Sequence, residues 1–324
     1  MNNEIFSIQT RQAFDEVCMK TFRHQAQHGA VYKEYLSLIH VDPATIQRPE
    51  AIPCLPIDFF KNHRITTGPE APQQVFTSSG TTGTVQSKHY VADITIYEDS
   101  FRTAFNQFYG NPSDMAILAL LPAYSEREGS SLIYMVDDLI RQSAHPRSGY
   151  FLYNHDDLQD SLRELKATGT PTLLIGVTYA LLDFVENHVV DFSELIVMET
   201  GGMKGRRREM IREEVHERLC RGFSVSEIHS EYGMTELLSQ AYSAGGGIFR
   251  CPPWMDVFIR DTNDPLDTVS TNRTGAINII DLANIHSCAF IATQDLGRKQ
   301  ADGSFEVLGR FDQSDIRGCN LLVQ

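Results

Sequence analysis

Residues 76–88, FTSSGTTGTVQSK, form the stretch of this 324-residue sequence that most clearly suggests chemistry. Eight consecutive residues, 77–84, are Ser, Thr or Gly, so the stretch has many hydroxyls and little apolar surface to bury. Glycine lets the backbone turn sharply and approach a ligand, and successive N–H groups in such a turn can bind an anion. We therefore expect a phosphate-binding loop after a strand that ends near Phe76, with Lys88 supplying a positive charge. The alternative is a flexible linker.

Two later segments also combine chemically active side chains. SEYGMTE, residues 230–236, brings an aromatic ring, a hydroxyl and a carboxylate within five residues. Its plainer explanation is a polar turn with a buried Tyr and a helix-capping Thr. TQDLGRKQADGSFEVLGRFDQSDIRGC, residues 293–319, mixes acidic and basic residues around Asp302-Gly303, a good hairpin signal. Its plainer explanation is a β-hairpin with solvated charges.

These three segments, in this order, resemble the motifs of the acyl-adenylate-forming superfamily, which includes acyl-CoA synthetases, phenylacetate-CoA ligases and luciferase-like ligases. The resemblance implies ATP and Mg²⁺ as cofactors, with Tyr232 stacking on the adenine, Thr235 binding the α-phosphate and Glu236 holding Mg²⁺. Asp295 and Arg310 would bind the ribose hydroxyls. The residues implied to contact the phosphates or pass beside the adenine are Thr77, Ser78, Ser79, Gly80, Thr81, Thr82, Gly83, Lys88, Gly201 and Gly202.

Within this superfamily the chain is most similar to the acyl-protein synthetase (LuxE) family of the bacterial bioluminescence fatty acid reductase complex. The likeness runs over nearly the whole length: IPCLPIDFFK at 52–61, the 77–83 loop, PAYSEREGSSLIYMVDDLI at 122–140, and the terminal RGC. It implies the large N-terminal-type domain of adenylate-forming enzymes, with layered mixed sheets, helices and a β-rich, barrel-like part. The C-terminal lid domain of other members is expected to be absent, and Cys319 occupies the position of the acyl-accepting cysteine.

The function implied is an ATP-dependent acyl-protein synthetase. It would activate a carboxylic acid, in this family a fatty acid, as an acyl-adenylate, release pyrophosphate and form a thioester on Cys319. An acyl reductase or an acyltransferase is the partner to expect. Two alternatives stay open: a ligase that delivers the acyl group to CoA or a carrier protein, and a nucleotide-binding subunit without catalysis.

Two further sets of residues have a chemical and a structural interpretation. Ser130 and Ser131 lie where this family would line the acyl pocket, but either could simply cap a helix. The cysteines show no C-x-x-C spacing and do not pair with His as in a zinc site, so we expect free, mostly buried thiols. They are Cys18, Cys54, Cys220, Cys251, Cys288 and Cys319.

The elements that must position these residues follow from hydrophobic spacing. Residues 1–70 are expected to form a lead-in of helices and a proline-rich, extended segment packed on the main domain. Between 71 and 241, strands and helices alternate, among them a helix expected over 94–109 and a strand over 115–121. This alternation predicts an α/β layer with a largely parallel sheet whose strand ends form the site. Short β-prone pieces from 242 to 312, such as 288–293, predict a β-rich part, and 313–324 would be a tail within the same single domain.

Composition excludes several classes of protein. The net charge of −14 argues against a nucleic-acid partner. No run approaches the roughly 20 apolar residues of a membrane span, and the N-terminus lacks an apolar signal-peptide core. We therefore expect a cytoplasmic protein.

Overall fold

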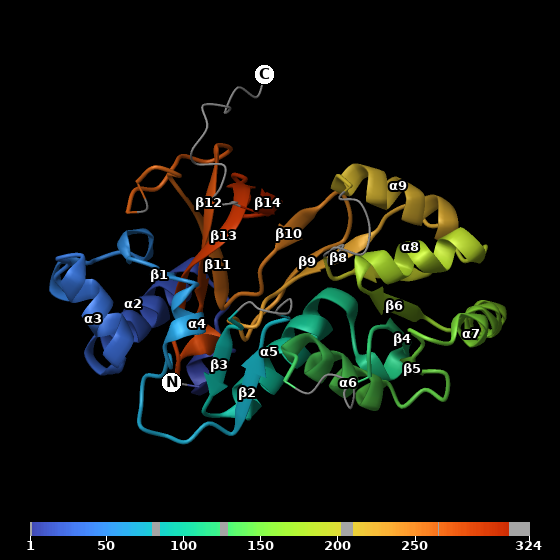
Figure 1. Cartoon of the computed structure of the whole chain (residues 1–324), viewed down its shortest axis with the longest axis horizontal. Helices are drawn as coiled ribbons and strands as arrows, with labels where there is room; N and C mark the ends of the chain where they lie inside the picture. The colour runs from blue at the N-terminus through green and yellow to red at the C-terminus, as the bar shows by residue number, and fades with distance from the viewer. Residues whose placement is uncertain (1, 80–84, 124–128, 202–209, 265, 311–324) are drawn as a thin grey trace.

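The computed structural model describes residues 2–79, 85–123, 129–201, 210–264 and 266–310, and it has an α/β architecture (Figure 1). The helices are α1 (Asn2–Ile5), α2 (Arg11–His28), α3 (Ala30–Leu38), α4 (Phe59–Asn62), α5 (Ile94–Tyr109), α6 (Ser131–Ser143), α7 (His155–Thr168), α8 (Thr178–Asn187) and α9 (Arg212–Phe223). The strands are β1 (Leu55–Pro56), β2 (Gln74–Thr77), β3 (Lys88–Val91), β4 (Ala116–Leu120), β5 (Gly149–Tyr150), β6 (Thr172–Gly176), β7 (Ile196–Glu199), β8 (His229–Tyr232), β9 (Ala241–Ser243), β10 (Ile248–Arg250), β11 (Met255–Arg260), β12 (Thr274–Asp281), β13 (Phe290–Lys299) and β14 (Phe305–Arg310).

Twelve strands of the described residues form one sheet in the order β11-β12-β13-β14-β10-β9-β8-β7-β6-β4-β5, with β1 added beside β13. Neighbours from β5 to β8 are parallel, whereas neighbours from β8 to β11 are antiparallel. Strands β2 and β3 form a separate antiparallel hairpin. The parallel α/β part and the β-rich part are therefore joined through β8.

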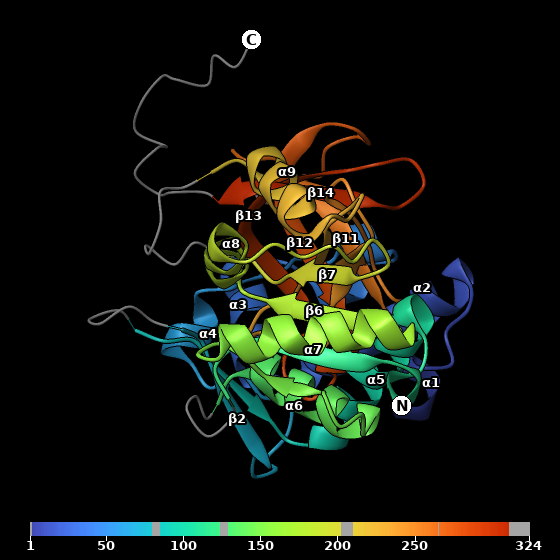
Figure 2. The ribbon, with the colours of Figure 1, turned by 90° about the vertical axis from the view of Figure 1, so that its right-hand side faces the viewer.

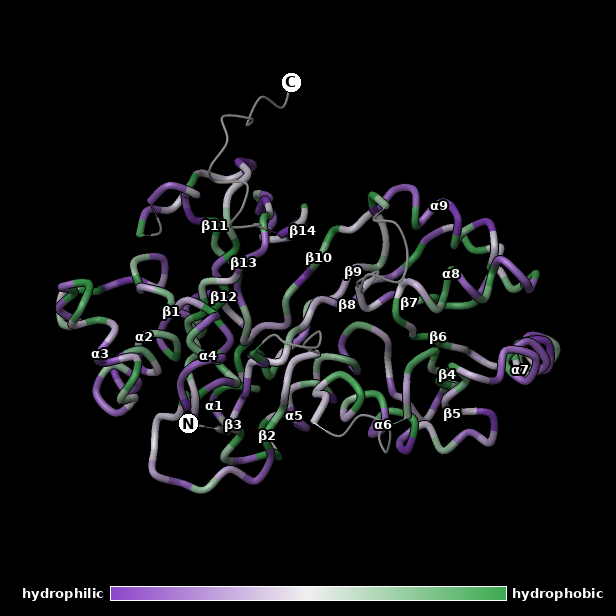
Figure 3. The backbone as a smooth tube through the Cα atoms, in the orientation of Figure 1, coloured by the Kyte–Doolittle hydropathy of each residue, from purple (hydrophilic) through white to green (hydrophobic). Residues whose placement is uncertain are grey.

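The burial of each strand explains which part of the sheet it occupies. All five residues of β4 are buried, as is typical of a parallel strand covered on both faces. Strand β11 instead alternates buried and half-buried residues, the pattern of a strand with one face on the core. In Figure 3 the strands β4 and β6 are green, whereas α7 on the outside is largely purple.

Helices cover the parallel strands on two faces. Helices α5 and α6 lie on one side and α8 and α9 on the other, while α7 lies at the far right in Figure 1 and in front of the strands in Figure 2. The predicted helix over 94–109 is confirmed, and the Asp93 side chain caps it by accepting the N–H of Thr95. At the carboxyl ends of β4, β6 and β7, the residues Leu121, Val177 and Thr200 line one cavity together with Thr77 of the β2–β3 hairpin.

The lead-in, expected to pack on the main domain, packs on its antiparallel strands. Strand β1 pairs in parallel with β13, with Leu55 opposite Ile291. From α2 and α3, the rings of Phe22 and Tyr32 lie 5.8 and 5.9 Å from that of Phe290. The passage is not extended throughout, because Phe59–Asn62 turns into the short helix α4.

Two strand boundaries differ from expectation. The predicted strand over 288–293 is longer and runs to Lys299, because the register with β12 and β14 carries polar residues that periodicity alone does not mark as strand. The segment 230–236, interpreted as a turn, begins inside strand β8 and turns only after Tyr232. The hairpin predicted at Asp302-Gly303 is confirmed by the antiparallel pair β13–β14.

Within the described ranges, no helix is both long and apolar enough to cross a membrane. The five cysteines found there are free thiols, and Cys18 and Cys288 are fully buried. Cys319 lies outside the described residues.

Candidate active site

Strand β2 ends at Thr77 and strand β3 begins at Lys88, so the two strands flank the hydroxyl-rich stretch, and Thr77 pairs with Lys88. The base of the loop is closed by Ser78, whose N–H donates to the Ser87 carbonyl (3.1 Å) and whose Oγ accepts the Ser87 N–H (3.0 Å). Lys88 is exposed at the first position of β3. The loop residues Gly80, Thr81, Thr82 and Gly83 lie outside the described residues.

The second segment lies at the junction of the two parts of the sheet. Strand β8 pairs in parallel with β7 and antiparallel with β9, so the turn after Tyr232 leaves the sheet where its direction pattern changes. In open α/β sheets ligands bind outside the carboxyl ends of the parallel strands, and the turn after Tyr232 leaves β8 at that end. The sequence therefore delivers Thr235 and Glu236 to a position suited to a site.

A buried histidine joins the hairpin to this turn. His89 of β3 lies with Nδ1 3.0 Å from the Thr235 carbonyl oxygen and Nε2 2.9 Å from Ser287 Oγ. Burial lowers the pKa of His89 to about 4, although the bond to Thr235 works in the opposite direction. The ring is neutral at pH 7, with Nδ1–H donating and Nε2 accepting. His89 was not identified from the sequence, because its hydrogen-bond partners, Thr235 and Ser287, lie far from it along the chain.

The third segment meets the second through a buried hydrogen bond. Tyr232 Oη donates to Asp295 Oδ2 (2.7 Å), and Arg310 Nε lies 3.3 Å from Asp295 Oδ1. Asp295 and Arg310 face each other in the β13–β14 register. The structure thus brings together three residues that the resemblance assigns to nucleoside binding.

The exposure of these three residues differs. Tyr232 is 9% exposed, and its ring contacts Phe249 and Phe305 at 5.8 and 5.7 Å. The Arg310 side chain is 79% exposed, so a ligand can reach it from solvent. Adenine stacking on Tyr232 remains a prediction.

Glu236 is a buried carboxylate without a cationic side chain in hydrogen-bond contact among the described residues. Burial raises its pKa, while a hydrogen bond from Ser87 offsets part of the shift. No group of three or more His, Cys, Asp or Glu within the described ranges could hold a metal by itself. Mg²⁺ bound with a nucleotide needs only one or two carboxylates, because phosphates and water supply the other ligands. Glu236 therefore fits a nucleotide-bound Mg²⁺.

Gly201 follows β7 with φ of +75°, a conformation that favours glycine. Its N–H donates to Glu199 Oε2 (2.8 Å), and Thr178 Oγ1 donates to the same oxygen (2.9 Å). Burial opposes the charged form of Glu199, but His216 and these hydrogen bonds outweigh it and hold the pKa of Glu199 below its usual value. Gly202 lies outside the described residues.

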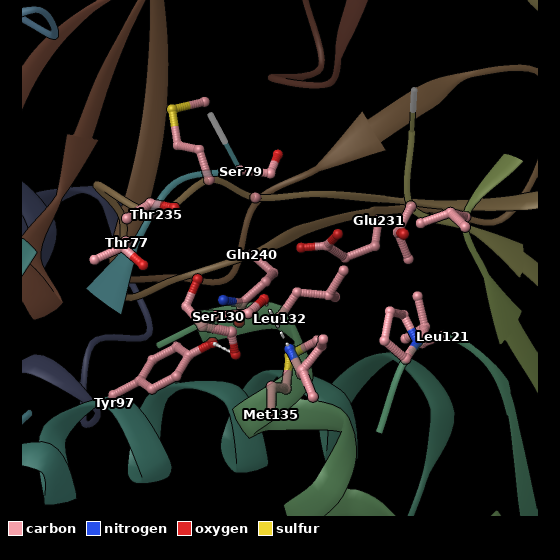
Figure 4. A pocket seen from close by; sticks show the side chains of 17 residues that line it. Thr77, Ser79, Tyr97, Leu121, Ser130, Leu132, Met135, Glu231, Thr235 and Gln240 are labelled. Carbon is pink, nitrogen blue, oxygen red and sulfur yellow. Dashed lines mark hydrogen bonds between the residues drawn. The ribbon is translucent and has the colours of Figure 1, made fainter. Parts of the chain in front are cut away.

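A cavity of about 130 Å³ opens beside these elements (Figure 4). Thr77 and Ser79 from the hairpin reach it from one side, together with Thr235 from the turn. In Figure 4, Glu231 and Gln240 lie between this hydroxyl-bearing end and Leu121. The remaining lining residues are Tyr97, Pro122, Ser130, Ser131, Leu132, Ile133, Met135, Val177, Thr200, Gly233 and Met234.

Ser130 is confirmed as a helix cap, whereas its role in an acyl pocket stays a prediction. Its Oγ accepts the N–H of Ile133 (3.4 Å) as the N-cap of α6, and it lines the cavity beside Ser131. Glu231 and Gln240 were missed by sequence reasoning. The one available signal is a charged residue, Glu231, placed between two buried residues of a strand.

No protein-family model and no curated protein sequence matches this chain. Solved structures do match it. An open 2-hydroxyisobutyryl-CoA ligase in complex with 2-HIB-AMP and CoA superimposes with a TM-score of 0.67 and 12% identity, over 93% of this chain and 75% of that one. The same ligase in its thioesterification state matches with a TM-score of 0.68 and 14% identity, over 94% of this chain and 70% of the ligase.

ATP-bound MatB from Rhodopseudomonas palustris matches with a TM-score of 0.55 and 14% identity, over 73% of this chain. The match spans about half of MatB, 47% of its length. At these identities the likeness shows the fold. The large α/β domain expected from the three motifs is thereby confirmed.

Proposed function

We propose that this chain is an ATP- and Mg²⁺-dependent ligase that activates a carboxylic acid as an acyl-adenylate. The observation that carries the proposal is the convergence of Tyr232, Asp295 and Arg310 in one hydrogen-bonded set. The chain neighbours of Tyr232, Glu231 and Gly233, line the cavity that Thr77 and Thr235 also line. These residues come from three separate segments of the chain. The fold shared with CoA ligases that bind acyl-AMP or ATP supports the same activity.

The residues around the cavity have distinct roles in this proposal. Asp295 and Arg310 hold the ribose, while the Thr77 and Ser79 hydroxyls and Lys88 bind phosphate oxygens. Thr235 positions the α-phosphate. Glu236 holds Mg²⁺, which offsets negative charge on the phosphates when bound.

The reaction has two steps. A carboxylate oxygen of the acid attacks the α-phosphorus of ATP, the bond to the β-phosphate breaks, and pyrophosphate leaves with those electrons. The chain contributes mainly positioning and hydrogen bonds to the phosphate oxygens. A thiolate then attacks the acyl carbonyl carbon, and AMP leaves as the thioester forms.

The acyl acceptor is the finer part of the proposal. The resemblance to acyl-protein synthetases favours self-acylation at Cys319, whose position lies outside the described residues. CoA is the alternative acceptor, and the matched 2-hydroxyisobutyryl-CoA ligase structures that contain CoA favour it. An acyl reductase or acyltransferase would be the partner of a self-acylated chain only.

One experiment decides between Cys319 and CoA as the acyl acceptor. The purified chain is incubated with ATP, Mg²⁺ and a mixed pool of carboxylic acids, and its intact mass and AMP release are measured. Self-acylation predicts a mass gain of one acyl group that hydroxylamine removes and that Cys319→Ser abolishes. AMP release that requires CoA, without a mass gain, identifies the CoA ligase. If the chain neither gains mass nor releases AMP, the proposed activity is contradicted, and a non-catalytic nucleotide-binding subunit is favoured.

A further inference from the structure

The cavity has a polar end that the proposed reaction does not use. The reaction needs the hydroxyl-bearing end at Thr77, Ser79 and Thr235. Glu231 and Gln240 line the same cavity and contact none of these side chains through a hydrogen bond among the described residues. Their chemistry bears on the part of the acid that does not react.

Glu231 presents a carboxyl group to the cavity. Gly233 leaves room for it: a Cβ at position 233 would lie 2.3 Å from Glu231 Oε1 and 3.3 Å from Gln240 Cγ. The Glu231 and Gln240 side chains therefore flank the same glycine. Burial raises the pKa of Glu231 to about 8, and the negative charge of Glu199 adds to the shift. A carboxyl that is mostly neutral at pH 7 can both donate and accept a hydrogen bond.

Two polar atoms from residues that line the cavity lack hydrogen-bond partners among the described residues. Gln240 is 4% exposed, and its Oε1 has no partner within the described part of the chain. The same holds for Thr200 Oγ1, from another residue that lines the cavity. Buried polar groups left unsatisfied are destabilising, so a cavity that keeps them is suited to a ligand that supplies the missing hydrogen bonds.

The size of the cavity limits the ligand. At about 130 Å³ it is close to an engineered cavity of roughly 150 Å³ that accepts benzene. A long acyl chain would exceed this space and would leave the carboxyl of Glu231 against methylene groups. A second carboxylate on the acid would meet the charged Glu199 nearby.

We propose that the acid activated here is a small carboxylic acid whose side group carries a hydroxyl or an amino group, bound by Glu231 and Gln240. This proposal rests on the proposed adenylating function and names its substrate class. It differs from the fatty acid that the family resemblance implies.

The test uses acids matched in shape. ATP–pyrophosphate exchange of the full chain is measured with 3-hydroxybutanoate, 3-aminobutanoate and 3-methylbutanoate, with the corresponding 2-substituted propanoates, and with tetradecanoate. We expect kcat/KM to be about 10- to 100-fold higher for a hydroxy or amino acid than for its methyl analogue, because the analogue leaves the polar end unsatisfied. Tetradecanoate should support no exchange.

Variants at Glu231 separate a specificity role from a structural one. Glu231→Leu should lower kcat/KM for the polar acid and raise kcat/KM for its methyl analogue. The preference should then fall below about threefold, since an apolar pocket rejects a hydroxyl only weakly. Glu231→Gln keeps a donor and an acceptor, so it should retain a preference for the hydroxy acid but lose one for the amino acid. Glu34→Leu, at an exposed position of α3, is the matched control and should leave all ratios unchanged.

The outcomes separate the two proposals. Exchange supported best by a methyl analogue or by tetradecanoate would overturn the polar substrate class and leave the adenylating function standing. Exchange with none of the acids would count against both. Equal losses for all acids in both Glu231 variants would show that Glu231 only supports the structure.

Discussion

At the scale of single residues, Glu236 is the side chain on which the proposed chemistry depends most directly. It is buried, its pKa is raised by that burial, and it is suited to a cation that arrives with the nucleotide. We predict that Glu236→Gln lowers ATP–pyrophosphate exchange by about 10²- to 10³-fold, the effect of removing one group that stabilises transition-state charge. The amide keeps the shape of the side chain but binds Mg²⁺ poorly.

The control for this substitution is a carboxylate away from the cavity. Glu34→Gln on the exposed side of α3 should leave exchange within about twofold of the unchanged chain. Thermal unfolding of both variants checks that the fold is retained. Normal exchange in folded Glu236→Gln would remove the proposed Mg²⁺ role.

At the scale of elements, His89 connects the β2–β3 hairpin to the turn after β8. Its pKa is lowered from 6.5 to about 4, so the unfolded chain binds the proton more readily between these pH values. The stability that neutral His89 contributes is therefore present above pH 6.5 and is lost as pH falls toward 4. We predict that lowering the pH from 6.5 to 4 reduces the unfolding free energy by on the order of 2–3 kcal/mol through protonation of His89.

Urea unfolding between pH 7 and pH 4 measures this effect. His89→Asn keeps a donor for the Thr235 carbonyl but does not titrate, so it should be less stable at pH 7 and approach the unchanged chain near pH 4. His28→Asn, at an exposed site in the last turn of α2, should keep the original pH dependence. A constant stability difference for His89→Asn across the pH range would contradict the assignment.

At the scale of the whole molecule, the lead-in and the β-rich part share one core. Phe290 is fully buried and contacts the rings of Phe22 and Tyr32 from the lead-in helices. We predict that Phe290→Ala lowers the unfolding free energy by about 3–5 kcal/mol, the usual effect of a large-to-small change in a core. Leu38→Ala, at a residue that is 70% exposed, should change it by less than about 0.5 kcal/mol.

The continuous sheet also predicts how unfolding proceeds. The single tryptophan, Trp254, is buried and donates from Nε1 to Ser239 Oγ (3.0 Å) and Ser100 Oγ (3.1 Å), so its fluorescence reports on the junction between the two parts. Fluorescence and far-ultraviolet circular dichroism should therefore give the same urea midpoint. Two separate midpoints would mean that the parts unfold independently.

Much of the fold followed from local sequence patterns. The helix over 94–109 was predicted because its apolar residues repeat at helical spacing. Strand β4 was predicted because a short, wholly apolar run fits only a buried strand or helix segment, and its length favours a strand. The hairpin signal at Asp302-Gly303 predicted a strand on each side of it, but not where each strand begins and ends, since their pairing depends on neighbours far along the chain.

By itself the sequence determined the residue types of the candidate site. Three motifs in a fixed order resemble those of a known superfamily, and this resemblance assigned Tyr232, Thr235, Asp295 and Arg310 to the site. Tertiary structure alone decided which of them meet: strand order brings Tyr232 to Asp295, and the hairpin brings His89 to Thr235. It also decided the environment of Glu231. The pKa of a carboxyl group rises when folding removes water from around it or places another negative charge nearby, and for Glu231 both happen. Neither condition is local in sequence.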